Sequence, residues 1–134
     1  MNIRFKKEWH KERKTMAKTI LVVDDEPDIL KTVSVILKHA GFNVLTAVDG
    51  NDCLKRLEKN KADLILLDIM MPGTPSKEIV KRIKNTKIVF LTAVQMSEAE
   101  KEQLLSSKNI VGYIQKPFDL EELVTKVKYY LSGK

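Results

Sequence analysis

The sequence has few of the features that make disulfides, histidine metal sites or membrane spans. Its single cysteine, Cys53, excludes an internal disulfide, and its place on the apolar side of a helical pattern predicts a position in the core. The two histidines, His10 and His39, have no cysteine or acid at metal-ligand spacing, which argues against a metal role for them. Apolar runs such as ILVV and LILL are too short to cross a bilayer, and no signal-peptide core follows the N-terminus. We therefore expect a cytoplasmic protein.

The composition is that of one folded domain preceded by a basic segment. At 134 residues, with 43% hydrophobic and 31% charged residues, the chain is long enough for one sizeable core and too short for two ordinary domains. Residues 1–15 contain six basic and two acidic residues and so supply most of the net charge of +6. We expect no nucleic-acid binding through the nearly neutral remainder. The predicted division is a basic extension over residues 1–16, disordered or loosely helical, and one domain over residues 17–134.

Five short apolar runs recur along the chain, with helical patterns between them. The runs begin 21 to 24 residues apart, at Thr19, Asn43, Leu64, Ile88 and Val111. This spacing fits one strand, one helix of about three turns and two loops, which is the repeating unit of a parallel sheet. The sequence therefore predicts an α/β fold with five parallel strands and five helices.

The order of the strands follows from how apolar each run is. Central strands of a parallel sheet are covered on both faces and read as unbroken apolar runs, as the first, third and fourth do. The second run contains Asn43 and Thr46 and the fifth contains Gly112 and Gln115, which favours edge positions for both. With right-handed crossovers, the predicted order is 2-1-3-4-5 in a doubly wound sheet. Ligands bind such sheets beyond the carboxyl ends of strands 1 and 3.

Residues suited to phosphate chemistry follow four of the five runs. They are Asp24, Asp25, Asp68, Thr92 and Lys116. Three carboxylates make an oxygen-rich site for Mg²⁺, and a hydroxyl and an ammonium are suitable donors to phosphoryl oxygens. The set indicates phosphoryl transfer to an aspartate.

The acidic run DDEPD divides into two parts. Glu26 and Asp28 are explained by helix initiation, because acids suit the positive end of the helix dipole and Pro27 suits the first helical position. Asp24 and Asp25 lie before the helix, where like charges repel unless a cation sits among them. We therefore expect alanine at either position to raise thermal stability and to abolish phosphorylation.

Four motifs in order resemble the receiver domain of two-component response regulators, namely ILVVDDE, LILLDIMMPG, FLTA and GYIQKPF. The resemblance covers roughly residues 18–131 and implies a flavodoxin-like fold. It also implies that Asp68 is the phosphoacceptor. The Mg²⁺ ligands that it implies are the carboxylates of Asp24, Asp25 and Asp68 and the backbone carbonyl of Met70.

The resemblance also assigns the residues around the phosphoacceptor. Thr92 binds a phosphoryl oxygen and moves on activation, Lys116 pairs with the phosphoryl group, and Tyr113 matches the switch aromatic. Met70 and Val94 match the two positions that tune dephosphorylation. Both are apolar and cannot hydrogen-bond an attacking water, so we expect a slow intrinsic loss of phosphate.

The implied function is a stand-alone receiver that switches protein–protein interactions or relays phosphate. It is not an enzyme beyond catalysing its own phosphorylation and dephosphorylation. The implied partners are a sensor histidine kinase, a downstream protein that the sequence does not identify, and a second copy in a phosphorylation-dependent homodimer. Two alternatives stay open. A haloacid dehalogenase-type phosphatase would need a second aspartate where Met70 stands, and a nucleic-acid-binding module would use residues 1–15.

Three local features lead to further expectations. Ser76 stands where the family commonly has glycine, which predicts a changed loop path after the third strand. The apolar stripe of the fourth helix is thin, which predicts a short or mobile helix there. By the resemblance, the bond from Lys116 to Pro117 is expected to be cis.

Overall fold

The computed structural model describes residues 17–71 and 76–132. Within them, five strands form one parallel sheet in the order β2-β1-β3-β4-β5, which confirms the predicted fold class and order. The strands are β1 (Thr19–Val23), β2 (Asn43–Ala47), β3 (Leu64–Asp68), β4 (Lys87–Thr92) and β5 (Ile110–Gln115). The basic extension predicted over residues 1–16 lies outside the described residues and stays a prediction.

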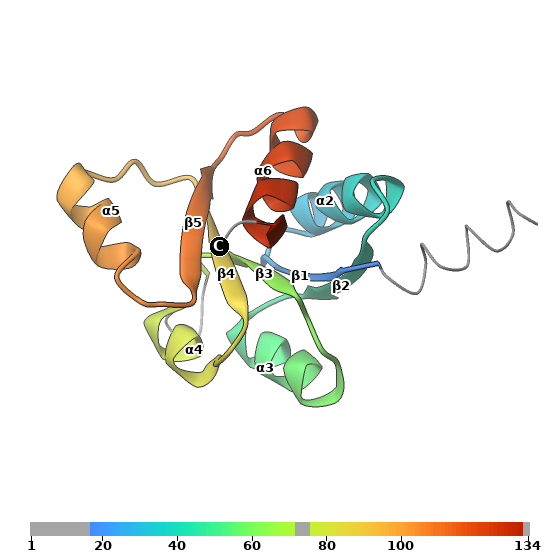
Figure 1. Ribbon diagram of the computed structural model, residues 1–134, viewed down its shortest axis with the longest axis horizontal. Helices are drawn as coiled ribbons and strands as arrows, with labels where there is room; N and C mark the ends of the chain where they lie inside the picture. The colour runs from blue at the N-terminus through green and yellow to red at the C-terminus, as the bar shows by residue number, and fades with distance from the viewer. Residues whose placement is uncertain (1–16, 72–75, 133–134) are drawn as a thin grey trace, which may run out of the picture.

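Helices cover both faces of the sheet, as expected for a doubly wound fold (Figure 1). They are α2 (Pro27–His39), α3 (Gly50–Lys59), α4 (Ser76–Arg82), α5 (Glu98–Leu104) and α6 (Leu120–Ser132). α2 and α6 pack on one face, where Val33 and Leu123 are fully buried. α3 and α4 pack on the other face, where Cys53 and Ile79 are fully buried. Cys53 is therefore a core residue, as its pattern predicted.

Burial explains why β1, β3 and β4 are the central strands. Every residue of β3, and all but the first residue of β1 and of β4, is buried, whereas β2 and β5 are only partly buried. The register then sets the position of the acidic residues. Val23 of β1 pairs with Leu67 of β3, so Asp24 and Asp68 follow at neighbouring strand ends. Asp68 in turn pairs with Leu91, the residue before Thr92.

The ends of two helices follow from their local sequence. Gly41, just beyond α2, has a φ of 102°, a conformation that glycine adopts without the strain that a Cβ would bring. Ser97 accepts a hydrogen bond from the Glu100 backbone N–H, and the Glu100 carboxylate accepts one from the Ser97 N–H. This capping box begins α5, which is only seven residues long and leaves each side chain at least partly exposed. α5 is the fourth of the five predicted helices, and its predicted shortness is thus confirmed.

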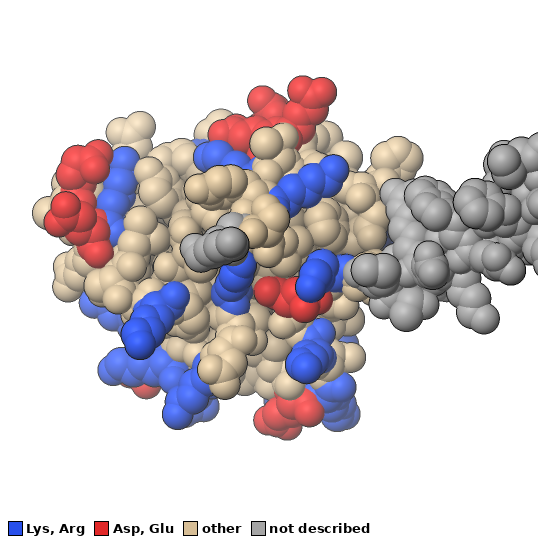
Figure 2. Space-filling view, in the orientation of Figure 1, with Lys and Arg blue, Asp and Glu red and all other residues tan. Residues whose placement is uncertain are grey.

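The surface does not form one basic face in the view of Figure 2. Acidic side chains gather over α5 and over the start of α6, whereas lysine and arginine spread over the lower part of the molecule. This mixed distribution agrees with the nearly neutral charge of the chain after residue 15. No helix among the described residues is both long enough and apolar enough to span a membrane.

Candidate functional site

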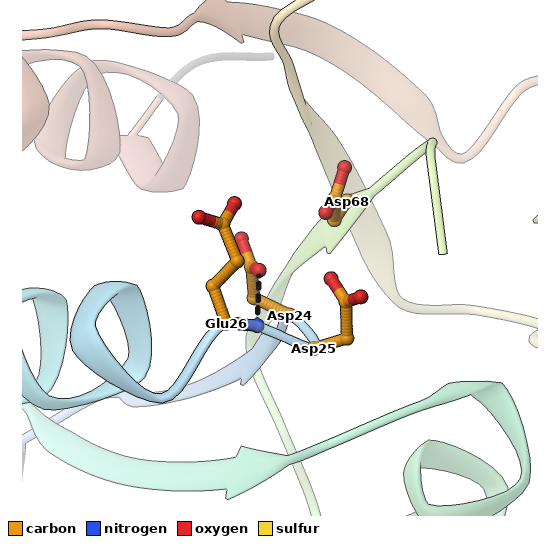
Figure 3. A group of neighbouring side chains, drawn as sticks. All are labelled: Asp24, Asp25, Glu26 and Asp68. Carbon is orange, nitrogen blue, oxygen red and sulfur yellow. Dashed lines mark hydrogen bonds between the residues drawn. The ribbon is translucent and has the colours of Figure 1, made fainter. Parts of the chain in front are cut away.

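Four carboxylates converge at the carboxyl ends of β1 and β3 (Figure 3). Asp24, Asp25 and Glu26 come from the loop between β1 and α2, and Asp68 is the last residue of β3. One carboxylate oxygen from each residue lies within 4.8 Å of those of the other three. Asp24 and Asp68 are buried, whereas Asp25 and Glu26 are exposed, so the group opens to solvent on one side. The structure thus brings the three predicted aspartates together and adds Glu26.

Lys116 supplies the cation that this acidic group needs. Its Nζ lies 2.7 Å from Asp24 Oδ2, 3.4 Å from Glu26 Oε1 and 3.5 Å from Asp68 Oδ2. The side chain is only 11% exposed, which limits solvent screening of these contacts. A backbone hydrogen bond from the Lys116 N–H to the Thr92 carbonyl, at 2.6 Å, fixes the start of the side chain beside β4. The bond from Lys116 to Pro117 is cis, as expected.

Burial and charge shift the pKa of both members of the Asp68–Lys116 pair. Burial raises the pKa of Asp68, and the Asp24 charge adds to this effect. The Met70 N–H, 3.0 Å from Asp68 Oδ1, and the Lys116 ammonium oppose it without cancelling it. For Lys116, burial lowers the pKa, but the hydrogen bond to Asp24 and the surrounding carboxylates together raise it above its ordinary value. The lysine therefore stays charged over the physiological pH range.

Thr92 is fully buried at the end of β4, and its hydroxyl is held by the loop that follows. Thr92 Oγ1 accepts a hydrogen bond from the Val94 N–H at 2.9 Å. The Gln115 side-chain amide donates to the Val94 carbonyl at 3.4 Å and so connects the same loop to β5. A displacement of the Thr92 hydroxyl would therefore act on the backbone of the β4–α5 loop.

The remaining predicted residues contribute no side chain to the group formed by the four carboxylates and Lys116. Tyr113 lies on β5, half-buried against the core, with Lys101 Nζ of α5 at 5.4 Å from its ring centroid. Met70 and Val94 each lie two residues beyond a strand end, and the two residues are 64% and 38% exposed. Tyr113 is thus placed to connect β5 with α5, and the two apolar residues lie just beyond Asp68 and Thr92, to which their backbone N–H groups donate hydrogen bonds.

The donor set fits a hard divalent cation. Oxygen ligands from carboxylates are those that Mg²⁺ prefers, and the site has four carboxylates against one ammonium. A divalent cation would therefore offset the negative charge that Lys116 leaves uncompensated. Asp24, Asp25 and Asp68 are the residues that would hold it, and the Met70 backbone carbonyl stays a predicted fourth ligand.

Two features of the site were not predicted from the sequence. Glu26 was explained by helix initiation, yet α2 makes no capping hydrogen bond with its side chain within the described residues, and the carboxylate instead faces Lys116. The pairing of Lys116 with Asp24 was also missed, because the two residues are 92 positions apart in the chain. The only sequence signal for either feature is the unusual density of acids in DDEPD.

The sheet is doubly wound, and acids, a hydroxyl and a lysine gather at the carboxyl ends of its central strands. The domain therefore belongs to the class of α/β domains that bind ligands at this edge of the sheet. A family model for the response regulator receiver domain matches residues 20–128. The chain belongs to this family of two-component systems. The match does not support the alternative interpretation as a haloacid dehalogenase-type phosphatase.

Individual relatives agree with this assignment. The alkaline phosphatase synthesis transcriptional regulatory protein PhoP of Bacillus subtilis is 36% identical over 118 residues, which cover 87% of this chain and 49% of PhoP. The transcriptional regulatory protein CrdR of Helicobacter pylori is 33% identical over 122 residues, which cover 87% of this chain and 56% of CrdR. The chain therefore spans about half the length of these curated relatives.

Solved structures show the same fold. The chemotaxis protein CheY4 of Vibrio cholerae is 31% identical with a TM-score of 0.74, and the match covers 84% of this chain and 97% of CheY4. The response regulator TrrA of Thermotoga maritima, solved in complex with Mg²⁺–BeF, is 38% identical with a TM-score of 0.70. That match covers 85% of this chain and 98% of TrrA.

Proposed function

We propose that this domain accepts a phosphoryl group on Asp68 from the phosphohistidine of a sensor histidine kinase. The observation that carries the proposal is the setting of the Asp68 carboxylate, which is buried at a strand end, 3.5 Å from a lysine ammonium and within an acidic group suited to Mg²⁺. The family assignment and the Mg²⁺–BeF complex of TrrA support it.

The transfer requires the ionised form of Asp68. A carboxylate oxygen attacks phosphorus, a phosphorus–oxygen bond forms, and the phosphorus–nitrogen bond breaks with its electron pair staying on the imidazole. Burial, the largest cause of the raised pKa of Asp68 in the metal-free site, leaves its carboxylate less solvated and so more nucleophilic than that of an exposed aspartate. Lys116 offsets negative charge on the phosphoryl oxygens through its ammonium. Bound Mg²⁺ supplies further charge neutralisation in the site.

The output follows from the position of Thr92. A phosphoryl group on Asp68 attracts the Thr92 hydroxyl, which then gives up its hydrogen bond from the Val94 N–H. The β4–α5 loop rearranges, and the change reaches Tyr113 and Lys101 at the contact between β5 and α5. The surface altered in this way binds a downstream protein or a second copy of the domain. Onward transfer of the phosphoryl group to another histidine is a further use of the same site.

The lifetime of the phosphoryl group depends on Met70 and Val94, the residues two positions beyond Asp68 and Thr92. Neither Met70 nor Val94 offers a side-chain hydrogen bond to orient an attacking water. We expect slow hydrolysis, and we expect Met70→Asn to shorten the phosphoryl lifetime because its amide can position water. The decay is measured by the release of phosphate, with Val35→Asn at an exposed position of α2 as the control. Rapid decay in the unmodified protein would contradict it.

The proposed phosphorylation is tested by incubating the protein with acetyl phosphate and Mg²⁺ and measuring its intact mass. We expect one added phosphoryl group in the unmodified protein and none in Asp68→Asn. Asp28→Asn is the matched control, since it removes an exposed acid in the first turn of α2 and should be phosphorylated normally. Equal uptake by Asp68→Asn and the unmodified protein would refute Asp68 as the acceptor.

A further inference from the structure

Lys116 and a bound metal ion would compete for the same carboxylate. Lys116 Nζ lies 2.7 Å from Asp24 Oδ2, and Asp24 is one of the residues that would hold Mg²⁺. Both Asp24 oxygens already have a partner, Lys116 at Oδ2 and the Glu26 N–H at Oδ1, so a metal ion on this carboxylate would lie close to the Lys116 ammonium and repel it. Metal binding therefore requires Lys116 to move away from Asp24 or to lose much of that contact. Asp68, the other buried carboxylate near Lys116 at 3.5 Å, would also hold the ion, so the nearly buried lysine then needs a further anionic partner.

Glu26 is placed to be that partner. Its Oε1 is already 3.4 Å from Lys116 Nζ, and its side chain is 61% exposed, so it can follow the lysine at modest cost. Its backbone is fixed, because the Glu26 N–H donates to Asp24 Oδ1 at 2.9 Å. Within the described residues, α2 makes no capping hydrogen bond with the Glu26 carboxylate, although Glu26 is the N-cap residue. The carboxylate thus remains available for Lys116.

We propose that Glu26 receives Lys116 when Mg²⁺ takes Asp24, and so acts as a positioning residue that sets the affinity of the site for metal. In this scheme Lys116 moves between an inner position on Asp24 and an outer position on Glu26. Without Glu26, Lys116 is held more tightly by Asp24, and metal binding becomes weaker. The inference rests on the magnesium site of the proposed function.

The competing interpretation is that Glu26 ligates the metal directly. Its carboxylate does lie within 4.8 Å of the three aspartates. However, Lys116 is already in contact with Glu26, whereas three aspartates can hold the ion without it. The two interpretations differ in one respect. An effect that passes through Lys116 disappears when Lys116 is removed, and direct ligation does not depend on the lysine.

Mg²⁺ titration by calorimetry tests the proposal without measuring phosphorylation. We expect Glu26→Gln to raise the Mg²⁺ dissociation constant by roughly two- to fivefold more than Asp28→Asn, as for loss of a partly exposed ion pair. Asp28→Asn is matched in charge and lies two residues further along, in the first turn of α2. It corrects for the general loss of one negative charge. Equal dissociation constants for the two variants would overturn the proposal.

A second comparison uses variants that lack the lysine. In a Lys116→Met background, Glu26→Gln should change the Mg²⁺ dissociation constant no more than Asp28→Asn does. A larger effect of Glu26→Gln that persists in this background would show direct ligation and overturn the proposal. Thermal melts in metal-free buffer check that each variant is folded, and Lys116→Gln replaces Lys116→Met if the latter is not.

The outcome for the unmodified protein separates this inference from the proposed function. If the unmodified protein binds no Mg²⁺, the proposed magnesium site fails and the inference fails with it. If it binds Mg²⁺ and Glu26→Gln matches Asp28→Asn, only the inference fails.

Discussion

We expect the neighbouring aspartates Asp24 and Asp25 to respond to alanine substitution in opposite directions. Sequence reasoning treated them alike and expected either removal to stabilise the fold by relieving repulsion. The structure distinguishes them. Asp24 is fully buried and pairs with Lys116 at 2.7 Å, whereas Asp25 is exposed on the open side of the acidic group.

The loss of unfolding free energy expected for Asp24→Ala follows from the contacts of Asp24. The substitution removes a charge-assisted hydrogen bond from a nearly buried Lys116, worth about 2 kcal/mol, and the acceptor of the Glu26 N–H, worth about 1 kcal/mol. Relief of the repulsion between Asp24 and Asp68 returns about 1 kcal/mol. The net loss is about 2 kcal/mol, which lowers the melting temperature by about 8 °C for a domain of this size.

For Asp25→Ala the balance is reversed. The side chain is exposed, and the main change is the removal of one like charge from the group, worth about 0.5 kcal/mol. We expect the melting temperature to rise by about 2 °C. Asp24→Asn should fall between the two alanine variants, because its amide oxygen can still accept from the Glu26 N–H.

Thermal unfolding followed by circular dichroism, in buffer with a chelator and no divalent metal, measures these shifts. Adding Mg²⁺ should raise the melting temperature of the unmodified protein and have little effect on either alanine variant, because ligands stabilise only the state that binds them. Similar shifts of the same sign for both alanine variants in metal-free buffer would refute this assignment of roles.

Three further predictions concern Asp68, Cys53 and Gly112. Because the folded state raises the pKa of Asp68 above 3.8, the protein binds that proton more tightly when folded, and its stability should fall as the pH rises through the raised value. In metal-free buffer, urea unfolding should show Asp68→Asn gaining stability over the unmodified protein as the pH rises above 3.8, and a constant difference would contradict this. Burial raises the pKa of Cys53 to about 12, so an aromatic disulfide reagent at pH 8 should modify the thiol only in denaturant, and rapid labelling of the native protein would contradict it. A methyl group on Gly112 would overlap the Tyr130 ring, so Gly112→Ala should cost about 1–3 kcal/mol in urea unfolding. Tyr130→Leu should recover part of that loss in the double variant, and strictly additive losses would contradict the contact.

The sequence was sufficient for the architecture because each element is encoded locally. Strand burial separates the apolar runs of β1, β3 and β4 from the mixed runs of β2 and β5, and this difference, together with right-handed crossovers, gave the order of the sheet. The predicted strands also gave the positions of Asp24, Asp68 and Thr92, since the carboxyl ends of parallel strands lie at the same edge of the sheet. The predicted starts of β4 and β5 were each one residue late. At β4 the missed residue is the polar Lys87, which does not extend an apolar run, whereas at β5 it is Ile110, which is itself apolar.

The tertiary structure decided which charges meet within that edge. Periodicity places a residue on an element, but it carries no information on which of four carboxylates a lysine 92 positions away will contact. The contact of Lys116 with Asp24, the inclusion of Glu26 and the contact of Tyr130 with Gly112 all depend on side chains from distant elements approaching within a few ångströms. For this reason the sequence by itself determined the fold and the three aspartates, the threonine and the lysine of the site, but not Glu26. Only the packed structure determined that Asp24 is held by a cation and Asp25 is not.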